Sequence, residues 1–381
     1  MRMRVVLIAV IVLAALTSAP AAHAAPPSND AFASAKTIAP FPFYDELSVA
    51  EATTEAGEPT PTCLGGSSIG HTLWYTYTPS VDIAVKANSY NSDFDTVIAL
   101  YKQTGSGFGG LVQLACNNNI QPAETVSRVA WNLVAGKQYY FQVGGVGAAN
   151  GTLKFRVKQR LFKVGLVRGN EWFLNNDFDG TAERFFTYGR ATDQQLTGDW
   201  VGAGVSLPWV RRGNAFYANR WLDGTPELIF SYGSATDTAL LGDFNGDGIL
   251  TPVVVRGNVW YFNNDFDGGA EFSLSFGRPT DVKLIGDWNG DGVYTPGVLR
   301  GNTWYLSNGF NGVADIVFSF GRSGDRPVVG DWDGNGTFTP GVVRGNVWYL
   351  NNGFDSTADV GFAFGRSTDR PIIGDWNGST E

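Results

Sequence analysis

Oxygen-bearing side chains recur at alternate positions in three short loops of the sequence. In the first loop, Asp243, Asn245 and Asp247 are followed by Gly248, which permits a sharp turn of the backbone. Calcium takes about six to eight oxygen ligands from carboxylate, amide and carbonyl groups, so such a loop can supply several of them. The spacing therefore predicts a Ca²⁺ site in each loop. The other two loops carry Asp287, Asn289 and Asp291, and Asp331, Asp333 and Asn335.

The same side chains have a second interpretation. Aspartate and asparagine often accept hydrogen bonds from backbone N–H groups a few residues further on, and so stabilise turns without a metal. Two further loops at the same spacing have lost the ligand set: Asp199 is followed by Val201 and Ala203, and the loop that begins at Asp375 runs out at Glu381. Metal binding and turn capping both remain open at this stage.

One serine lies in a pattern that resembles a catalytic nucleophile. Residues 66–70 read Gly-Ser-Ser-Ile-Gly, which matches the G-x-S-x-G pattern around Ser68. That pattern has meaning only on a strand-turn-helix elbow with aspartate and histidine further along the chain. Here a strand pattern follows instead, and His71 is only three residues away. We therefore assign no catalytic residue.

The three loops belong to a repeat that runs through the second half of the chain. The Arg-Gly-Asn triplet and an aromatic-glycine pair keep the same step of 44 residues as the loop aspartate. An unbroken period of this length is the signature of a repeat architecture. The loop aspartates are Asp199, Asp243, Asp287, Asp331 and Asp375, and the arginines are Arg168, Arg212, Arg256, Arg300 and Arg344.

Each period contains four runs that read as strands. A Gly-Asn pair separates the second run from the third, and a two-residue loop of this kind suits the twist of a β-hairpin. Four antiparallel strands per period are typical of a β-propeller blade. In the fourth period the runs are Pro327–Trp332, Thr339–Arg344, Val347–Leu350 and Ala358–Phe364.

The ends of the repeat region predict a closed ring. The region, residues 160–381, opens with the second strand of a blade at Lys163–Arg168 and ends with a first strand at Pro371–Trp376. Pairing of these two segments would complete a five-bladed propeller and remove the exposed strand edges of an open array. Tryptophans repeated at one position, such as Trp260 and Trp304, are expected to pack between blades, and a sugar-stacking role is the alternative.

The start of the chain has the features of a secretory signal peptide over residues 1–24. Arg2 and Arg4 precede an apolar run from Val5 to Leu16, and a small-residue cleavage pattern ends at Ala24. We therefore expect a secreted, extracellular protein with no membrane span after cleavage. The net charge of −9 argues against a nucleic-acid partner, which would require a basic surface.

Residues 25–159 form a separate region with alternating, β-branched and aromatic runs. These runs predict an antiparallel β-sandwich. The two cysteines, Cys63 and Cys116, both lie in this region, and an exported chain is expected to join them in a disulfide. The expected strands are residues 71–79, 95–101, 137–143 and 151–157.

The first region resembles the bacterial pre-peptidase C-terminal domain. The resemblance is carried by Asn29–Phe32, Ala52–Pro59, Trp74–Pro79, Ser92–Thr96 and Gly136–Tyr140, in the order typical of that family. It implies a jelly-roll-like sandwich that serves as an accessory module of exported proteins. No peptidase domain accompanies it here, so the resemblance does not imply proteolysis.

The repeats resemble the FG-GAP/VCBS-type repeats of integrin-like propellers. The motif order is an aromatic-glycine pair, a short strand, Gly-Asp-aromatic-Asn-Gly-Asp-Gly and another strand. The resemblance implies a ligand-binding propeller that holds Ca²⁺ between the first two strands of a blade. The family usually ends this loop with an acidic ligand, where Thr251, Thr295 and Thr339 stand here. A hydroxyl replaces a carboxylate poorly, so weak binding is expected.

Two functions compete on this evidence. The first is a secreted, non-catalytic binding or adhesion protein whose repeated loops bind a carbohydrate or protein ligand with avidity. The alternative is a secreted, glycosidase-like hydrolase with paired carboxylates in the propeller channel. An enzyme site should break the repeat, whereas the loop aspartates follow it, so the binding function is favoured. Acids that are expected to lie outside the repeat do exist, but sequence alone cannot place two of them together; they are Glu171, Glu183, Glu227 and Glu271.

Overall fold

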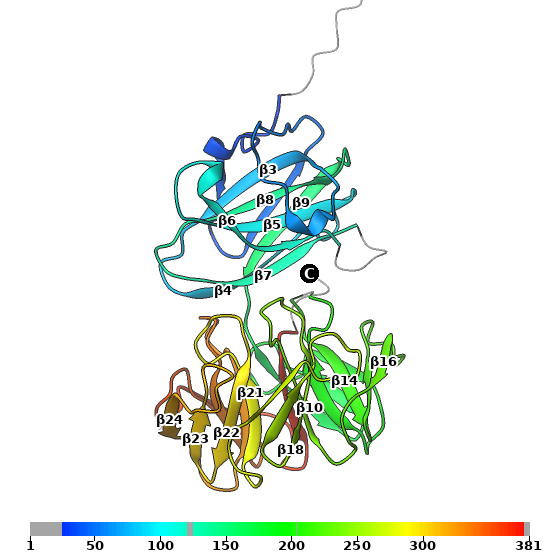
Figure 1. The fold of residues 1–381 in the computed structure, drawn as a ribbon, viewed down its shortest axis with the longest axis vertical. Helices are drawn as coiled ribbons and strands as arrows, with labels where there is room; N and C mark the ends of the chain where they lie inside the picture. The colour runs from blue at the N-terminus through cyan, green and yellow to red at the C-terminus, as the bar shows by residue number, and fades with distance from the viewer. Residues whose placement is uncertain (1–24, 120–124, 203, 377–381) are drawn as a thin grey trace, which may run out of the picture.

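Short runs of β-branched and aromatic residues, separated by Gly, Asn and Asp, form strands along the whole of the described chain. The computed structural model describes residues 25–119, 125–202 and 204–376, and the expected signal peptide, residues 1–24, lies outside them. The fold is all-β, with two sheets in the N-terminal part and five in the C-terminal part (Figure 1). Among the described residues, no helix has the length and apolarity needed to cross a bilayer.

The N-terminal part contains a five-stranded and a four-stranded sheet. The five-stranded sheet has the order β1 (Lys36–Thr37), β3 (Ile69–Tyr77), β8 (Tyr139–Val146), β5 (Thr96–Gln103) and β6 (Leu111–Asn117). The four-stranded sheet has the order β2 (Phe43–Ser48), β9 (Thr152–Gln159), β4 (Ile83–Asn88) and β7 (Arg128–Leu133). Three 3₁₀ turns complete this part: η1 (Phe32–Ser34), η2 (Thr62–Leu64) and η3 (Phe108–Gly110).

The inner faces of these two sheets share one hydrophobic core. Tyr75 of β3 and Phe141 of β8 pack with Phe155 of β9, and all three side chains are fully buried. In β9 every second residue is buried, as expected for a strand with one face on a core. The four strands expected from the sequence are confirmed, with shifts of up to three residues at their ends. The predicted disulfide is also confirmed: Cys63 and Cys116 join η2 to β6, with Cα atoms 5.8 Å apart.

The C-terminal part contains five antiparallel sheets of four strands each. The first sheet combines β29 (Arg370–Gly374), β10 (Lys163–Arg168), β11 (Glu171–Leu174) and β12 (Arg184–Thr187). The second contains β13 (Gln194–Gly198), β14 (Leu207–Arg212), β15 (Ala215–Ala218) and β16 (Leu228–Ser231). The third contains β17 (Thr238–Gly242), β18 (Thr251–Arg256), β19 (Val259–Phe262) and β20 (Phe272–Ser275). The fourth contains β21 (Val282–Gly286), β22 (Thr295–Arg300), β23 (Thr303–Leu306) and β24 (Ile316–Ser319). The fifth contains β25 (Arg326–Gly330), β26 (Thr339–Arg344), β27 (Val347–Leu350) and β28 (Val360–Ala363).

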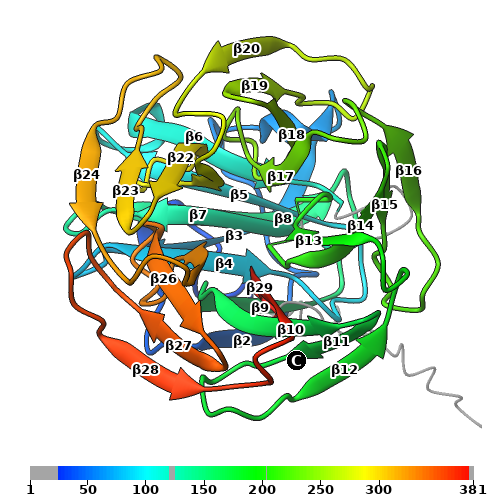
Figure 2. The same cartoon turned by 90° about the horizontal axis from the view of Figure 1, so that it is seen from below.

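The five sheets follow one another around a common centre. The first strands β13, β17, β21, β25 and β29 contact one another in cyclic order, and Figure 2 shows the sheets placed around this centre. The expected pairing of the two ends is confirmed, because β29 pairs with β10 in a register that places Ile373 opposite Val164. This pairing covers the edge of β10 that would otherwise be exposed.

Repeated tryptophans are buried between these sheets, as the sequence predicts. Trp172, Trp260, Trp304 and Trp348 are fully buried. Each donates its indole N–H to the carbonyl of the aromatic residue 16 positions later, at 3.1 to 3.2 Å. Because their one polar atom is satisfied, these side chains contribute apolar area without the cost of an unpaired donor.

Candidate functional site

The three loops predicted to bind calcium lie at the end of the five sheets that faces the N-terminal sandwich. Each loop joins the first strand of a sheet to the second, and its first aspartate is buried. We call the five equivalent residues the hub aspartates. They are Asp199, Asp243, Asp287, Asp331 and Asp375, and all are buried.

Backbone N–H groups occupy both oxygens of the carboxylates in these loops. Asp243 accepts hydrogen bonds from Gly246 and Gly248, each at 2.7 Å, and Gly248 has a φ of 85°, which only glycine adopts readily. Asp331 accepts equivalent bonds from Gly334 at 2.8 Å and Gly336 at 2.9 Å. The turn-capping interpretation therefore describes the geometry of these side chains, and metal binding here stays a prediction.

The remaining predicted ligands of these loops lie nearer the surface and bond one another. Asn245 donates its amide to Asp247 at 2.9 Å, and Asn289 donates to Asp291 at 2.8 Å. In the third loop, Asn335 donates to Asp333 at 3.2 Å. A metal at any of these loops would have to replace these bonds as well as those that cap the turn.

Burial raises the pKa values of three hub aspartates. Desolvation raises the pKa of Asp243 to about 6 and the pKa of Asp287 to about 7, although backbone N–H donors oppose the rise. Desolvation also raises the pKa of Asp331 to about 7. A carboxyl group with a raised pKa is a typical candidate for general acid chemistry, which is why the hydrolase alternative has to be examined at this position.

A cavity of about 450 Å³ lies between the hub and the sandwich. Its lining includes Asp243, Asp287 and Asp331, together with Arg128 and Arg160. The acids that converge here are the repeated ones, and each caps its own loop. The convergence of unmatched acids that a hydrolase would require is not found among the described lining residues.

The sandwich contacts the hub loops directly. The Nδ2 of Asn132 donates to the carbonyls of Gly290 at 3.2 Å and Gly336 at 3.1 Å, and Lys86 Nζ donates to Asp375 at 2.5 Å. The linker residue Phe162 donates its backbone N–H to the carbonyl of Asp331 at 3.0 Å. Because the sandwich covers much of this end, the hub loops are poorly placed to present a multivalent surface.

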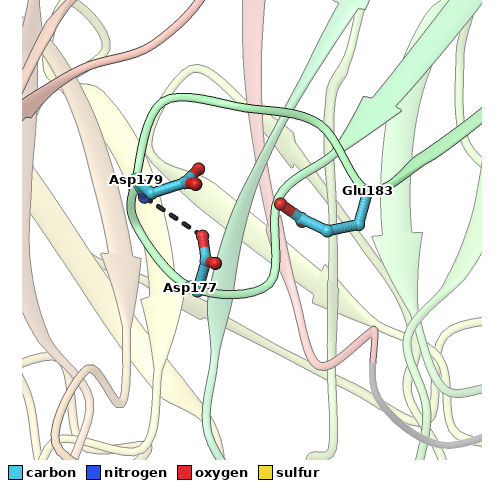
Figure 3. A group of neighbouring side chains, drawn as sticks. All are labelled: Asp177, Asp179 and Glu183. Atoms are coloured by element: carbon cyan, nitrogen blue, oxygen red, sulfur yellow. Dashed lines mark hydrogen bonds between the residues drawn. The ribbon is translucent and has the colours of Figure 1, made fainter.

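Two acidic groups that could hold a metal ion occur elsewhere, in the loops between the third and fourth strands. Asp177, Asp179 and Glu183 form one group, and each offers an oxygen within 4.8 Å of the others (Figure 3). All three are exposed, and Asp179 donates its backbone N–H to Asp177 at 3.2 Å. The second group consists of Asp265, Asp267 and Glu271.

Sequence reasoning missed these groups, although a signal was present. The expectation that Glu183, Glu227 and Glu271 lie outside the repeat is wrong, because they are spaced by 44 residues. Acidic residues precede them by four and six positions in two of the copies. In the second copy Trp221 takes the place of the first aspartate. Among the described residues the grouping therefore occurs in the first and third sheets only, and it breaks the fivefold repeat.

The opposite end of the sheets carries five copies of an arginine–aspartate pair. Arg300 donates from Nε and Nη2 to Asp281 at 2.9 and 2.7 Å, while its guanidinium lies 4.7 Å from the centre of the Tyr305 ring. We call this arrangement the arginine clamp. The five clamps pair Arg168 with Asp369, Arg212 with Asp193, Arg256 with Asp237, Arg300 with Asp281 and Arg344 with Asp325.

The clamps leave the arginines at the surface and bury the acids. Side-chain exposure is 58% for Arg256 and 1% for Asp237. Hydrogen bonds from Arg256 are the main cause of the lowered pKa of Asp237. A groove of about 540 Å³ lies beside this clamp and is also lined by Pro279 and Lys283. Each clamp joins the second strand of a sheet to the residue that directly precedes the first strand of the same sheet, so these contacts lie within one sheet.

The serine motif does not lie on a strand-turn-helix elbow, because in the described part of the chain strand β3 follows it directly. Ser68 immediately precedes β3, and its backbone carbonyl accepts a hydrogen bond from Gly147 at 2.7 Å. The ring Nε2 of His71 lies 3.5 Å from the side-chain amide of Asn150. The histidine therefore faces an amide on the β8–β9 connection.

A scan against protein-family models finds no match for this chain, and a search of curated proteins finds no significant relative.

Proposed function

We propose that this protein is a secreted, non-catalytic binding or adhesion protein built as a jelly-roll-like sandwich followed by a five-bladed β-propeller. The cyclic contacts of the five first strands and the pairing of β29 with β10 support the propeller. The signal-peptide pattern and the disulfide between Cys63 and Cys116 support secretion. The family resemblances of both regions are consistent with this proposal.

The observation that carries the binding function is the fivefold display of clamp arginines at the end of the sheets that lies away from the sandwich. Each of the five arginines is between 31% and 58% exposed, and each lies over an aromatic ring. Such a surface offers a ligand five equivalent planar donors. Individually weak contacts gain strength when a repeating ligand engages several of them together.

The ligand class that best matches this surface is an extracellular carbohydrate or protein with repeated acidic groups. Arginine presents a fork of N–H donors that fits carboxylate and sulfate oxygens. One edge of each guanidinium is held by the aspartate, so the ligand would use the remaining edge. We further propose that a metal held by the exposed acidic groups is Ca²⁺, because all the ligands there are hard oxygens.

The test is binding to arrays of glycans and extracellular proteins that include sulfated and uronate-bearing chains, with Ca²⁺ and with EDTA. We expect binding to acidic repeating glycans or proteins, and a stepwise loss of apparent affinity in Arg256→Gln and in Arg256→Gln/Arg300→Gln. Lys137→Gln is the matched control, because it removes one positive charge from the exposed surface of the sandwich.

The outcomes separate the alternatives. Equal loss of binding in Lys137→Gln and Arg256→Gln would show that net charge alone governs binding and would contradict a role for the clamps. Turnover of a polysaccharide by the wild-type protein, without retention on the array, would contradict a non-catalytic function.

A further inference from the structure

An arginine bridges the gap between neighbouring sheets at three places on the clamp end, which is the end of the sheets that carries the arginine clamps. In every sheet the first residue of the first strand pairs with a residue of the second strand, and in three sheets this pair contains an arginine. Each of these guanidiniums donates to an oxygen atom of the next sheet, across a gap that we call a clamp seam. The bridges run from Arg211 to the backbone oxygens of Ser234 and Asp237, from Arg326 to the backbone oxygen of Asp369, and from Arg370 to the side-chain oxygen of Gln195.

The clamp seam between the third and fourth sheets has no such bridge among the described residues. Thr238 takes the position that Arg326 has in the fifth sheet. Its partner Val255 takes the position that Arg211 has in the second sheet. Both side chains are shorter than arginine, and a groove of about 540 Å³ lies at this seam. The clamp arginine beside the groove, Arg256, is 58% exposed, whereas the other four clamp arginines are 31% to 35% exposed.

The pair of the fourth sheet is apolar on both strands, because Val282 pairs with Leu299. Neither of these side chains can donate a hydrogen bond to a ligand. An exposed hydroxyl group in the pair, that of Thr238, therefore distinguishes the third sheet from the other four.

The charged groups around this groove leave one positive charge over. Asp237 and Asp281 line the groove, and each is already paired with a clamp arginine, Arg256 and Arg300 respectively. Lys283 also lines the groove, and its Nζ donates only to backbone carbonyls, at 2.6 to 3.4 Å. The two ion pairs cancel, so the lysine gives the groove a net positive charge that a ligand with one negative charge would balance.

The side chains at the surface of the groove can contact such a ligand. Arg256 uses Nε and Nη2 in its clamp, at 2.9 Å each, which leaves Nη1 for a ligand. Thr236 and Thr238 are exposed, and among the described residues their hydroxyl groups have no hydrogen-bond partner. Pro279 and Val282 add an exposed apolar surface, and Val282 is 48% exposed.

We propose that this groove binds one uronate unit of an extracellular polysaccharide. The carboxylate of the sugar would accept hydrogen bonds from Arg256, because guanidinium donors suit carboxylate oxygens. The sugar hydroxyls would bond to Thr236 and Thr238, and the apolar C–H face of the ring would lie on Pro279 and Val282. This inference rests on the proposed binding function, and it names the ligand unit that one of the five clamps selects.

A sugar unit matches the groove better than an acidic amino-acid side chain does. A carboxylate on a flexible side chain would use the guanidinium but would leave both threonine hydroxyls and the apolar surface without contacts. The volume of the groove lies within the range of about 300 to 1,000 Å³ that is typical of small-molecule sites, so it can hold a sugar ring.

The experiment measures binding of methyl glucuronide to the full mature chain by isothermal titration calorimetry. Methyl glucoside is the uncharged counterpart of this probe. The α-methylamide of acetylglutamic acid carries the same charge without a sugar ring. We expect saturable binding of one glucuronide per chain, and at least tenfold weaker binding of each of the other two probes.

Two variants test the shape and the hydroxyl groups of the groove separately. Thr238→Arg copies Arg326 and should fill the groove, so it should reduce glucuronide binding tenfold or more although it adds a positive charge. Thr236→Val keeps the shape and removes a hydroxyl, and should weaken glucuronide binding severalfold. Thr280→Val is the matched control, because it makes the same change at the equivalent position of the next sheet, outside the groove. Thermal denaturation of each variant confirms that it is folded.

Three results would overturn this inference. The first is the absence of saturable glucuronide binding to the wild-type protein at millimolar concentration. The second is unchanged glucuronide binding in a folded Thr238→Arg variant. The third is equal binding of the glucuronide and the glutamate derivative, which would indicate an acidic protein ligand. Because Thr238→Arg keeps all five clamp arginines, its retention on the glycan and protein arrays tests the proposed function independently of the groove.

Discussion

Lys86 Nζ donates a hydrogen bond to Asp375 Oδ2 at 2.5 Å, although the two residues are 289 positions apart in the chain. Both side chains are almost fully buried, with exposures of 1% and 2%. Lys86 lies on β4 of the sandwich, and Asp375 directly follows β29, the strand that completes the first sheet. One ion pair therefore links the sandwich to the point where the ring of sheets closes.

Removing either partner of this pair should be costly. Desolvation lowers the pKa of Lys86 to about 8, so the lysine depends on Asp375 to remain charged. Lys86→Met and Asp375→Asn should each lower the free energy of unfolding by about 3 to 5 kcal/mol, because each leaves a buried charge without its partner. The double variant should lose less than the sum, as measured by urea denaturation. Fully additive losses would contradict a direct coupling.

The arginine clamps should make stability fall in acid. The pKa values of Asp193, Asp237, Asp281, Asp325 and Asp369 are all lowered. A carboxyl group with a lowered folded-state pKa contributes stability above its unfolded pKa, and this contribution is lost as the pH falls through the folded value. The melting temperature should therefore decrease below about pH 4.

Asp237→Asn provides the matched test of that pH dependence. It should destabilise the protein by about 1 to 2 kcal/mol at pH 7, a modest value because Arg256 is half exposed. Its melting temperature should fall less steeply in acid than that of the wild-type protein. Parallel curves for the two proteins would argue against the clamp as a source of the acid sensitivity.

Loss of the disulfide should destabilise the sandwich more than the five sheets. The bridge closes a loop between residues 53 positions apart, so the chain-entropy model assigns it about 4 kcal/mol. In Cys63→Ala/Cys116→Ala, the sandwich should become the first part cut by limited proteolysis. Reduction of the wild-type protein should give the same pattern, and a difference between the two would point to disrupted packing at the substituted positions.

Calcium should stabilise the protein if either set of acidic loops binds it. At a tenfold excess of free Ca²⁺ over Kd, each occupied site adds about 1.4 kcal/mol, seen as a rise in melting temperature that EDTA reverses. Asp177→Asn/Asp265→Asn removes ligands from the exposed acidic groups, and Asp247→Asn/Asp291→Asn removes ligands from the hub loops. The pair that abolishes the shift identifies the site. A wild-type melting temperature that is the same in Ca²⁺ and EDTA would exclude both.

Deletion of β29 should convert a closed arrangement into an open one. A chain that ends at Asp369 lacks the partner of β10 and exposes the backbone donors and acceptors of that strand. We expect dimers or larger aggregates by light scattering, because an unpaired edge strand favours pairing with a second chain. A chain that ends at Trp376 keeps β29 and is the control. If the chain that ends at Asp369 is folded and monomeric, the pairing of β29 with β10 is not what prevents association.

Local patterns in the sequence determined much of the fold of this protein. The sequence predicts the strands and the hairpin turn at Gly345 and Asn346, because these depend on neighbouring residues. It also predicts the disulfide, because an exported chain is expected to enter an oxidising compartment. The 44-residue step also predicted that β29 would pair with β10, since a repeat imposes the same packing on each copy.

Only the tertiary structure decided which of the repeated residues share a surface. The hub aspartates Asp375 and Asp287 accept hydrogen bonds from Lys86 and Asn132 of the sandwich, and no period in the repeat indicates these contacts. The contact between Phe310 of the fourth sheet and Phe272 of the third, with ring centroids 5.1 Å apart, is likewise set by how neighbouring sheets pack. Contacts between distant segments depend on how whole sheets pack, and sequence spacing within one segment does not record that packing.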